Sequence, residues 1–182
     1  MQINVSQLLK SSIGSVREYE LSDYVDISGE GTKELVEGEI KLTRTHRGIL
    51  AQGTLHTTIT INCSRCLHPF DHRFTIKIEE EYFPLIDVVS GIPLPLPEEP
   101  GYFTIDEHHI IDLSEAVRQN ALLAIPMKPL CREDCKGLCA ECGQDLNEEQ
   151  CKCREGEIDP RWTKLAELAS INKKTNKKLR SK

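Results

Sequence analysis

The stretch from Cys131 to Cys153, CREDCKGLCAECGQDLNEEQCKC, constrains the fold of this chain more than any other part. Six of the chain's eight cysteines fall within it, and they come in close pairs separated by a short polar loop. Two thiolates with two residues between them can turn back on one metal ion when the residue after the second tolerates a positive φ. Cys139, Cys142 and Gly143 have this arrangement. The pattern therefore predicts a zinc knuckle.

A later pair of cysteines would complete this knuckle to a zinc ribbon around a soft, non-redox cation that prefers sulfur. The preferred ligand set, which makes the most compact ribbon, is Cys139, Cys142, Cys151 and Cys153. Cys135 lies just before the knuckle and could replace one member of the last pair. Cys131 and Cys135 are otherwise left over, and they either form a second site with Cys63 and Cys66 or are thiols without a metal.

The alternative interpretation of these cysteines is that they form disulfides or are small buried hydrophobic residues. The first residues, MQINVSQLLKSS, have no basic start followed by an apolar run, so we expect no secretory signal. Clustered CxxC pairs in a cytoplasmic chain are more typical of metal sites than of disulfides. No apolar run approaches the roughly 18 residues that a membrane span needs. We therefore expect a cytoplasmic protein that holds structural Zn²⁺ and has no membrane partner.

The clearest hydrophobic periodicity lies on the two sides of the first CxxC pair. Five apolar residues from Ile49 to Ile61 fall on odd positions, namely Ile49, Ala51, Leu55, Ile59 and Ile61. From Phe70 to Tyr82 the apolar residues fall on even positions. Alternation of this kind is typical of half-buried antiparallel strands. The sequence therefore predicts a long hairpin with Cys63 and Cys66 at its tip. Further alternation predicts strands over residues 16–21 and 35–42.

The strongest helix pattern lies between Asp112 and Pro126. Asp112 with Glu115 three residues later indicates a capping box, and Pro126 ends the pattern. One apolar stripe of this helix comprises Leu113, Ala116, Val117, Ala121 and Ala124. We expect the helix to lie on the open face of the sheet. Before it, the proline-rich residues 84–101 predict an extended, exposed excursion, and after the cysteines Asp159 and Pro160 predict a second helix start.

These patterns together predict an α+β fold: an antiparallel β-sheet or partly open β-barrel with a packed helix, plus a small C-terminal zinc-ribbon-like segment. We expect residues 1–130 to form the β domain with its long hairpin and helix. Residues 131–170 would form the cysteine-rich segment and a short helix, and residues 171–182 a basic tail.

The charge of the chain is distributed unevenly. The full sequence has 23 Lys and Arg against 29 Asp and Glu, but residues 171–182 contain six of the basic residues and no acid. The preceding 170 residues therefore carry a balance of −12, which disfavours phosphate and favours a basic partner surface. The tail alone could contact RNA, although a short basic end is more often only solubilising. The candidate RNA-binding residues are Lys173, Lys174, Lys177, Lys178 and Arg180.

The pair Cys63 and Cys66 also raises the possibility of a redox or metal-dependent enzyme. Redox CxxC pairs lie at a helix N-terminus, where the helix dipole lowers the pKa of the first thiol. Here the flanking segments have the pattern of strands. No nucleophile, base and orienting group stand at a recognisable spacing, and no glycine-rich phosphate loop is present. We therefore expect a chain with no enzymatic activity and no small-molecule substrate.

Five segments of the sequence carry a resemblance to a known family. They are CSRCLHPF at 63–70, EEEYFP at 79–84, LLAIPMKPLC at 122–131, DCKGLCAECGQDLN at 134–147 and DPRW at 159–162. In combination they resemble the bacterial YceD family, the large ribosomal RNA subunit accumulation proteins. The resemblance implies a role in the accumulation of large-subunit (23S) ribosomal RNA and in ribosome assembly, without an established enzymatic activity.

The resulting hypothesis is a non-enzymatic ribosome-biogenesis factor that binds ribosomal RNA or a basic large-subunit ribosomal protein. One alternative is a metal-dependent or redox enzyme that uses Cys63 and Cys66. Another is a protein-interaction adaptor outside ribosome assembly.

Overall fold

The structure is a computed structural model that describes residues 1–29, 31–98, 100–153 and 160–162. It consists of two compact units, residues 1–137 and residues 138–182. The predicted helix after Asp159 falls outside the described residues, except that Pro160–Trp162 form one short 3₁₀ turn, η1. The basic tail, with its candidate RNA-binding lysines and arginine, also lies outside them.

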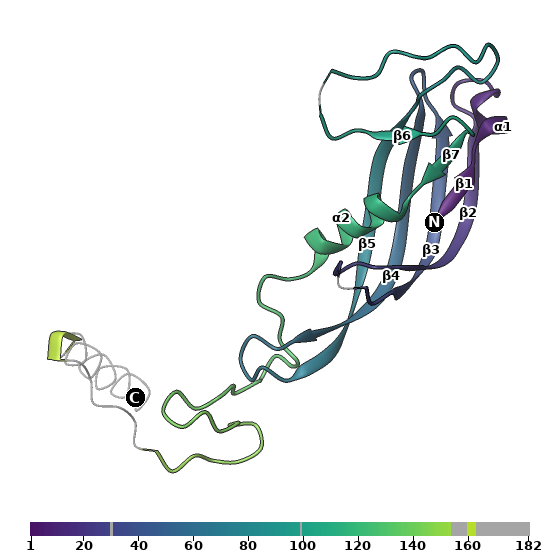
Figure 1. Ribbon diagram of the computed structural model, residues 1–182. Helices are drawn as coiled ribbons and strands as arrows, with labels where there is room; N and C mark the ends of the chain where they lie inside the picture. Colours follow the sequence, from purple (N-terminus) through teal and green to yellow (C-terminus); the bar gives the residue numbers. More distant parts are fainter. Residues whose placement is uncertain (30, 99, 154–159, 163–182) are drawn as a thin grey trace, which may run out of the picture. The chain divides into compact units, whose positions relative to one another are not determined.

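Within the described residues, the first unit contains one seven-stranded sheet with the order β1-β7-β6-β5-β4-β3-β2 (Figure 1). The strands are β1 (Gln2–Asn4), β2 (Val16–Val25), β3 (Glu34–Arg44), β4 (Ile49–Asn62), β5 (Pro69–Pro84), β6 (Phe103–Ile105) and β7 (Ile110–Asp112). Neighbouring strands are antiparallel, as predicted, except that β5 and β6 are parallel. A parallel neighbour requires the chain to return to the level of the earlier strand. The excursion between Pro84 and Phe103 makes this return, and within it Ile86 and Pro93 form an isolated bridge.

The predicted hairpin is formed by β4 and β5, and its alternating faces are confirmed. Ala51, Leu55 and Ile59 of β4 are buried, whereas Thr54 and His56 between them are exposed. The inner residues of the two strands face each other directly, because the register pairs Leu55 with Ile76. This register extends unbroken to Asn62. The CxxC pair therefore lies at the tip of the β4–β5 hairpin, beyond the main core.

Two glycines allow the sheet to curl. At Gly53 a Cβ atom would lie 2.6 Å from the Glu39 carbonyl oxygen, and at Gly38 it would clash with the carbonyl oxygen of Thr54. Neighbouring backbones therefore approach more closely there than any side chain permits, which is how glycine introduces curvature into a sheet. The curl brings the edge strands together, since the amino group of Met1 on β1's end lies 3.2 Å from the Asp23 carboxylate on β2. The sheet is a half-barrel, in agreement with the predicted partly open barrel.

Two helices of the described residues, α1 (Ser6–Leu9) and α2 (Ser114–Ala124), close the core. Figure 1 shows α2 lying across the face of the sheet, and it contacts β5 and β2. The buried residues at its sheet side are Leu113, Ala116, Val117 and Ala121, which confirms most of the predicted stripe. Ala124 is instead exposed because the helix ends there, and Ile125 packs against the core in its place. No described helix is long and apolar enough to cross a membrane.

The predicted capping box at the start of α2 is wrong in its second half. The Asp112 carboxylate does accept a hydrogen bond from the amide N–H of Ser114, at 2.9 Å. Glu115, however, does not reach back to Asp112. Its carboxylate accepts two hydrogen bonds from the guanidinium of Arg118, at 2.7 and 2.8 Å. A charged fork one turn ahead outcompetes a neutral backbone N–H for the carboxylate.

Candidate metal centres

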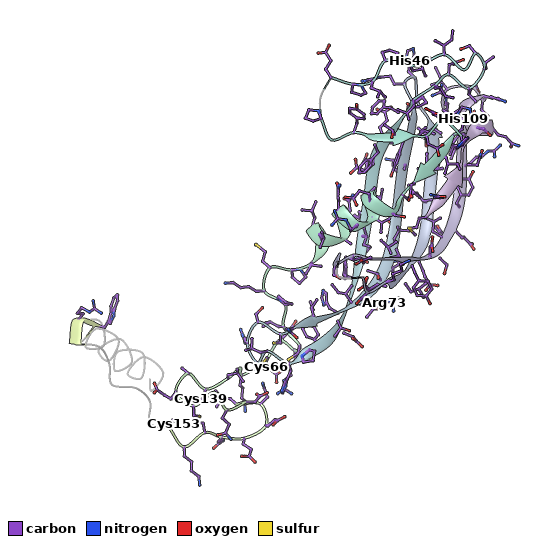
Figure 2. All side chains as sticks on the ribbon, in the orientation of Figure 1. His46, Cys66, Arg73, His109, Cys139 and Cys153 are labelled. Carbon is purple, nitrogen blue, oxygen red and sulfur yellow. The ribbon has the colours of Figure 1, made fainter. Side chains whose placement is uncertain are left out.

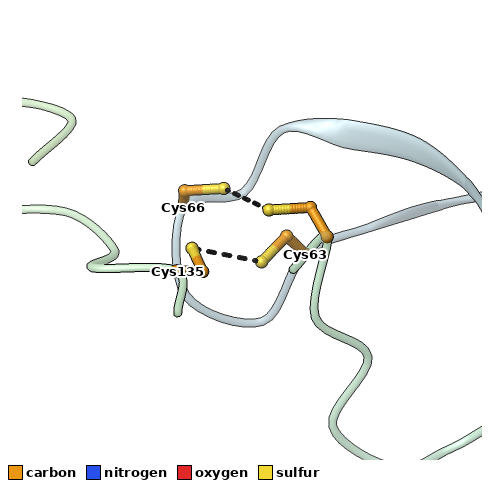
Figure 3. A group of neighbouring side chains, drawn as sticks. Cys63, Cys66 and Cys135 are labelled. Carbon is orange, nitrogen blue, oxygen red and sulfur yellow. Dashed lines mark hydrogen bonds between the residues drawn. The ribbon is translucent and has the colours of Figure 1, made fainter. Parts of the chain in front are cut away.

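Four cysteines of the first unit converge at the tip of the β4–β5 hairpin. We call Cys63, Cys66, Cys131 and Cys135 the hairpin cluster, and their sulfur atoms all lie within 4.8 Å of one another (Figure 3). The Cys63 and Cys135 sulfurs are 3.8 Å apart, and those of Cys66 and Cys131 are 3.7 Å apart. The structure thus groups the two cysteines that the sequence left open with the CxxC pair, across sequence separations of 65 and 72 residues.

The tight turn at the hairpin tip places the first two sulfurs side by side. The Leu67 amide N–H donates to the Cys63 carbonyl oxygen at 3.0 Å, and the Arg65 amide N–H donates to the Cys63 sulfur at 3.5 Å. The turn requires a positive φ directly after the second cysteine, and Leu67 adopts it with φ 62°. A leucine is strained in this conformation by about 1–2 kcal/mol. The turn that glycine makes in a typical knuckle is therefore made here by leucine.

The segment after α2 is fastened to this tip by backbone hydrogen bonds as well as by sulfur. The amide N–H of Ser64 donates to the Pro129 carbonyl oxygen at 2.8 Å. The Arg65 guanidinium donates to the Cys135 carbonyl oxygen at 2.7 Å. Gly137 packs against Arg65 so closely that a Cβ would lie 3.1 Å from the Arg65 carbonyl oxygen. The fold itself therefore holds the second pair of sulfurs against the first.

The second group, which we call the ribbon cluster, comprises Cys139, Cys142, Cys151 and Cys153, the set that the sequence favoured. Their sulfurs also lie within 4.8 Å of one another, and Figure 2 labels Cys139 and Cys153 within this second unit. The Cys151 sulfur lies 3.4 Å from that of Cys139 and 3.7 Å from that of Cys142.

The knuckle turn of the ribbon cluster repeats the geometry of the hairpin tip. The Gly143 amide N–H donates to the Cys139 carbonyl oxygen at 2.9 Å, and the Glu141 amide N–H donates to the Cys139 sulfur at 3.4 Å. Gly143 has φ 73°, which confirms the positive φ predicted from the sequence. An isolated bridge between Leu138 and Asp145 closes the loop.

Both clusters have the dimensions that a tetrahedral metal–thiolate site requires. Four sulfurs at about 2.3 Å from a central zinc ion are separated from one another by roughly 3.8 Å. The closest sulfur pairs of the hairpin cluster lie at 3.7 and 3.8 Å, and those of the ribbon cluster at 3.4 and 3.7 Å. Each cluster is a set of four soft donors close to this geometry. Each could therefore hold one metal ion.

The thiol pKa values within each cluster differ in a way that suits metal binding. The Cys66 amide N–H donates to the Cys63 sulfur and lowers the pKa of that thiol to about 6. In the ribbon cluster, the Cys142 amide N–H lowers the pKa of Cys139 to about 7, while the hydrogen bond with Cys151 raises the pKa of Cys153 to about 12. One acidic thiol in each cluster supplies a first thiolate near neutral pH. A cation then displaces the remaining protons, so metal affinity should fall as the pH falls.

The two clusters differ sharply in burial. In the hairpin cluster, Cys63, Cys66 and Cys135 are buried and only Cys131 is exposed. In the ribbon cluster, no cysteine is buried. Of the residues that the structure describes after Gly137, none has a buried side chain.

Comparison with known proteins identifies the family to which this chain, with both cysteine clusters, belongs. Residues 51–169 match the family described as large ribosomal RNA subunit accumulation protein YceD. The chain belongs to the YceD family. The matched span includes both cysteine clusters, α2 and the hairpin from Ala51 onward.

Several curated relatives are similar to this YceD family member over much of its length. An uncharacterized protein of Mycobacterium tuberculosis (strain ATCC 25618 / H37Rv) is 33% identical over 134 residues, covering 74% of this chain and 62% of the relative. The chloroplastic large ribosomal RNA subunit accumulation protein YCED homolog 1 of Arabidopsis thaliana is 26% identical over 189 residues, covering 92% of this chain and 57% of the relative. The chain thus spans about three fifths of the length of these relatives. No solved structure matches it.

Proposed function

We propose that this chain is a non-enzymatic assembly factor that supports the accumulation of large-subunit ribosomal RNA. It would act by binding that RNA or a basic large-subunit ribosomal protein. The observation that carries this proposal is the family match over residues 51–169, whose description names large ribosomal RNA subunit accumulation.

The metal that we assign to both clusters is structural Zn²⁺. A tetrahedral set of four thiolates is typical of zinc or of an iron–sulfur cluster, and closed four-sulfur sites with knuckle turns are typical of structural zinc. The hairpin cluster, with Cys63 and Cys135 buried, would fasten the hairpin tip to the segment after α2. The ribbon cluster would fold the loop that contains it.

The surface charge of the first unit favours a basic partner. Residues 1–137 carry 13 Lys and Arg against 21 Asp and Glu, a balance of −8. Four exposed glutamates stand on the outer side of the neighbouring strands β2 and β3, and Glu20 lies directly opposite Glu39. Like charges placed opposite each other destabilise the sheet locally. A bound cationic surface would relieve this repulsion.

The proposal is tested by depleting the protein from cells that carry it. We expect the ratio of large-subunit to small-subunit ribosomal RNA to fall, and we expect ribosomal RNA or large-subunit proteins to co-purify with the chain at moderate salt. An unchanged ratio would overturn the proposal and favour an adaptor outside ribosome assembly. Recovery of neither RNA nor ribosomal protein would contradict the binding mechanism.

The competing enzymatic function through Cys63 and Cys66 makes a different prediction. Both sulfurs are buried and each lies within 3.8 Å of a further cysteine sulfur, which supports a ligand role over redox turnover. A Cys63→Ser/Cys66→Ser variant should bind one zinc ion where the natural chain binds two, as measured by elemental analysis. If the variant keeps both its metal content and full support of ribosomal RNA accumulation, neither the enzymatic function nor the hairpin zinc site survives.

A further inference from the structure

The end of α2 carries large apolar side chains that the core does not use. The helix buries a stripe through Leu113, Val117 and Ala121. Leu122 and Leu123 fall off this stripe, and they are 43% and 84% exposed. Met127, shortly after the helix ends, is 100% exposed. Single exposed apolar residues are normal on protein surfaces, but three within six positions of one segment call for a physical reason.

Of these three residues, Leu122 lines a groove of about 470 Å³ on the same unit. It is lined by residues 58–61 of β4 near the hairpin tip, by the loop after β2 with the first residue of β3, and by the end of α2. The apolar lining residues are Ile27, Ile59, Ile61, Leu122 and Ile125. We call this groove the α2 groove. Leu123 directly follows the lining residue Leu122 in the chain, and Met127 comes two positions after the lining residue Ile125.

The α2 groove has the composition of a protein-binding surface. An exposed apolar patch beside a concave apolar surface marks an interaction site, and methionine is enriched in such interfaces. The residues that line the groove all belong to the first unit, and Ile59 among them is only 6% exposed. An apolar side chain of a partner could therefore be inserted between α2 and the hairpin without rearrangement of the sheet.

The charge of the groove selects the kind of partner. Among the described residues that line it, the only charged one is Glu34, and the remaining polar groups are serine and threonine hydroxyls. A phosphate backbone would meet no cation there, and nucleic-acid affinity depends on cations. A basic protein segment would instead be attracted by Glu34 and by the net charge of −8 on this unit.

We propose that the α2 groove binds an apolar anchor residue on a segment of a basic large-subunit ribosomal protein, with Leu123 and Met127 covering the anchor. This inference rests on the proposed function and names its partner class and its surface. Of the two partners considered in the proposed function, it selects the ribosomal protein and places its binding surface at one end of the half-barrel.

Site-specific photocrosslinking in cells tests the assignment. The full chain carries p-benzoylphenylalanine in place of Leu123, or in place of Ile13 as the matched control. Ile13 is 64% exposed and follows α1. Its neighbour Gly14 donates its amide N–H to the carbonyl oxygen of Arg44 on β3, which pairs with Ile49 at the opposite end of β4 from the groove. We expect the probe at position 123, but not at position 13, to form an adduct with a large-subunit ribosomal protein of strong positive charge. An RNA adduct, an adduct with a second copy of this chain, or no adduct at position 123 would overturn the inference.

The affinity of the full chain for the purified, captured ribosomal protein then provides a second measurement. Leu123→Glu should weaken binding at least about tenfold, as loss of an interface hot spot does, and Ile13→Glu should not change it. Both residues are exposed, so neither variant should alter the thermal unfolding of the chain. Equal binding by the two variants would contradict the role of the groove.

Ribosomal RNA levels separate failure of this inference from failure of the proposed function. If depletion of the chain lowers the ratio of large-subunit to small-subunit RNA and Leu123→Glu restores it fully, only the α2 groove is excluded. If depletion leaves the ratio unchanged, the proposed function itself fails. The inference predicts that Ile13→Glu restores the ratio and Leu123→Glu does not.

Discussion

The hairpin cluster and the ribbon cluster present the same four-sulfur donor set in opposite structural settings. The hairpin cluster lies in a unit with its own hydrophobic core, and three of its four cysteines are buried. The ribbon cluster lies in a unit whose described residues include no buried side chain. In the first unit, a metal ion would add a cross-link to a structure that already has a folded core. In the second unit it would be the main source of folding free energy.

The sequence separation of the sulfurs differs as well. In the hairpin cluster the paired sulfurs are 65 and 72 residues apart, and in the ribbon cluster they are 9 and 12 residues apart. Closing a longer loop removes more entropy from the unfolded chain. Cross-link arithmetic gives about 4 kcal/mol for the longer loops and about 3 kcal/mol for the shorter ones. The hairpin cluster therefore has the larger cross-link free energy, although its unit depends less on a metal ion for folding.

The largest expected effect is that of removing metal from both sites. A strong zinc chelator should abolish the protection of the Cys139 and Gly143 amides against hydrogen exchange, because their hydrogen bonds lie in a loop without a core. Structural zinc contributes about 10–16 kcal/mol in small zinc domains. The amides of β3, β4 and β5 should keep their protection, since that sheet has a buried core. Hydrogen-exchange mass spectrometry measures both regions in one sample. Retained protection in residues 138–153 would show that the ribbon loop folds without metal.

Single ligand substitutions compare the two clusters directly. Cys135→Ser should lower the unfolding free energy of the first unit by up to about 4 kcal/mol, the value for a cross-link of this loop length. Cys142→Ser should leave the same unfolding transition in place, because Cys142 belongs to the other unit. Urea denaturation followed by the far-ultraviolet signal of the sheet measures the difference. Equal destabilisation by the two variants would mean that the clusters are not energetically separate.

The fold of the long hairpin was accessible from the sequence because its signal is local and long. Alternation between Ile49 and Ile61, and again between Phe70 and Tyr82, fixes both the strand faces and the position of the CxxC pair at the tip. The parallel pairing of β6 with β5 was not accessible. Phe103–Ile105 is too short to carry a period, and its direction depends on the path of the excursion before it. The capping prediction at Glu115 failed because Arg118 competes for the carboxylate.

The candidate sites divide in the same way. The proximity of the four ribbon-cluster sulfurs was predictable because spacing and the glycine after Cys142 are local properties of the sequence. The partners of Cys131 and Cys135 stayed open because their proximity to Cys63 depends on tertiary packing, visible in the contact of Ser64 with Pro129. A usable signal was nevertheless present. Gly137, two residues after Cys135, marks a second tight turn, with φ 76°.

Glycine substitutions should also affect the two units differently, but with smaller changes in stability than those above. Gly53→Ala places a Cβ 2.6 Å from the Glu39 carbonyl oxygen, in a sheet that cannot shift without opening its core, and should cost about 2–3 kcal/mol. Gly143→Ala meets no atom within 4 Å, and its cost is the positive φ alone, about 1–2 kcal/mol. The first should appear as a lower melting temperature of the sheet, and the second only as weaker zinc retention by the ribbon cluster. A lower melting temperature of the sheet in the Gly143→Ala variant would show that the two units are energetically coupled.

The smallest effect concerns the one knuckle turn that lacks a glycine. Leu67→Gly relieves a strained positive φ but adds freedom to the unfolded chain, and these two terms of about 1–2 and 0.4–1 kcal/mol oppose each other. Leu67 is 62% exposed, so little apolar burial is lost. The net result should be stabilisation by about 0.5 kcal/mol, together with slower zinc release from the hairpin cluster. Leu67→Val is the matched control, because a β-branched residue tolerates this conformation poorly and should speed zinc release. Chelator competition kinetics rank the three chains, and faster release from Leu67→Gly than from Leu67→Val would show that the leucine side chain, and not the backbone turn, sets the stability of this site.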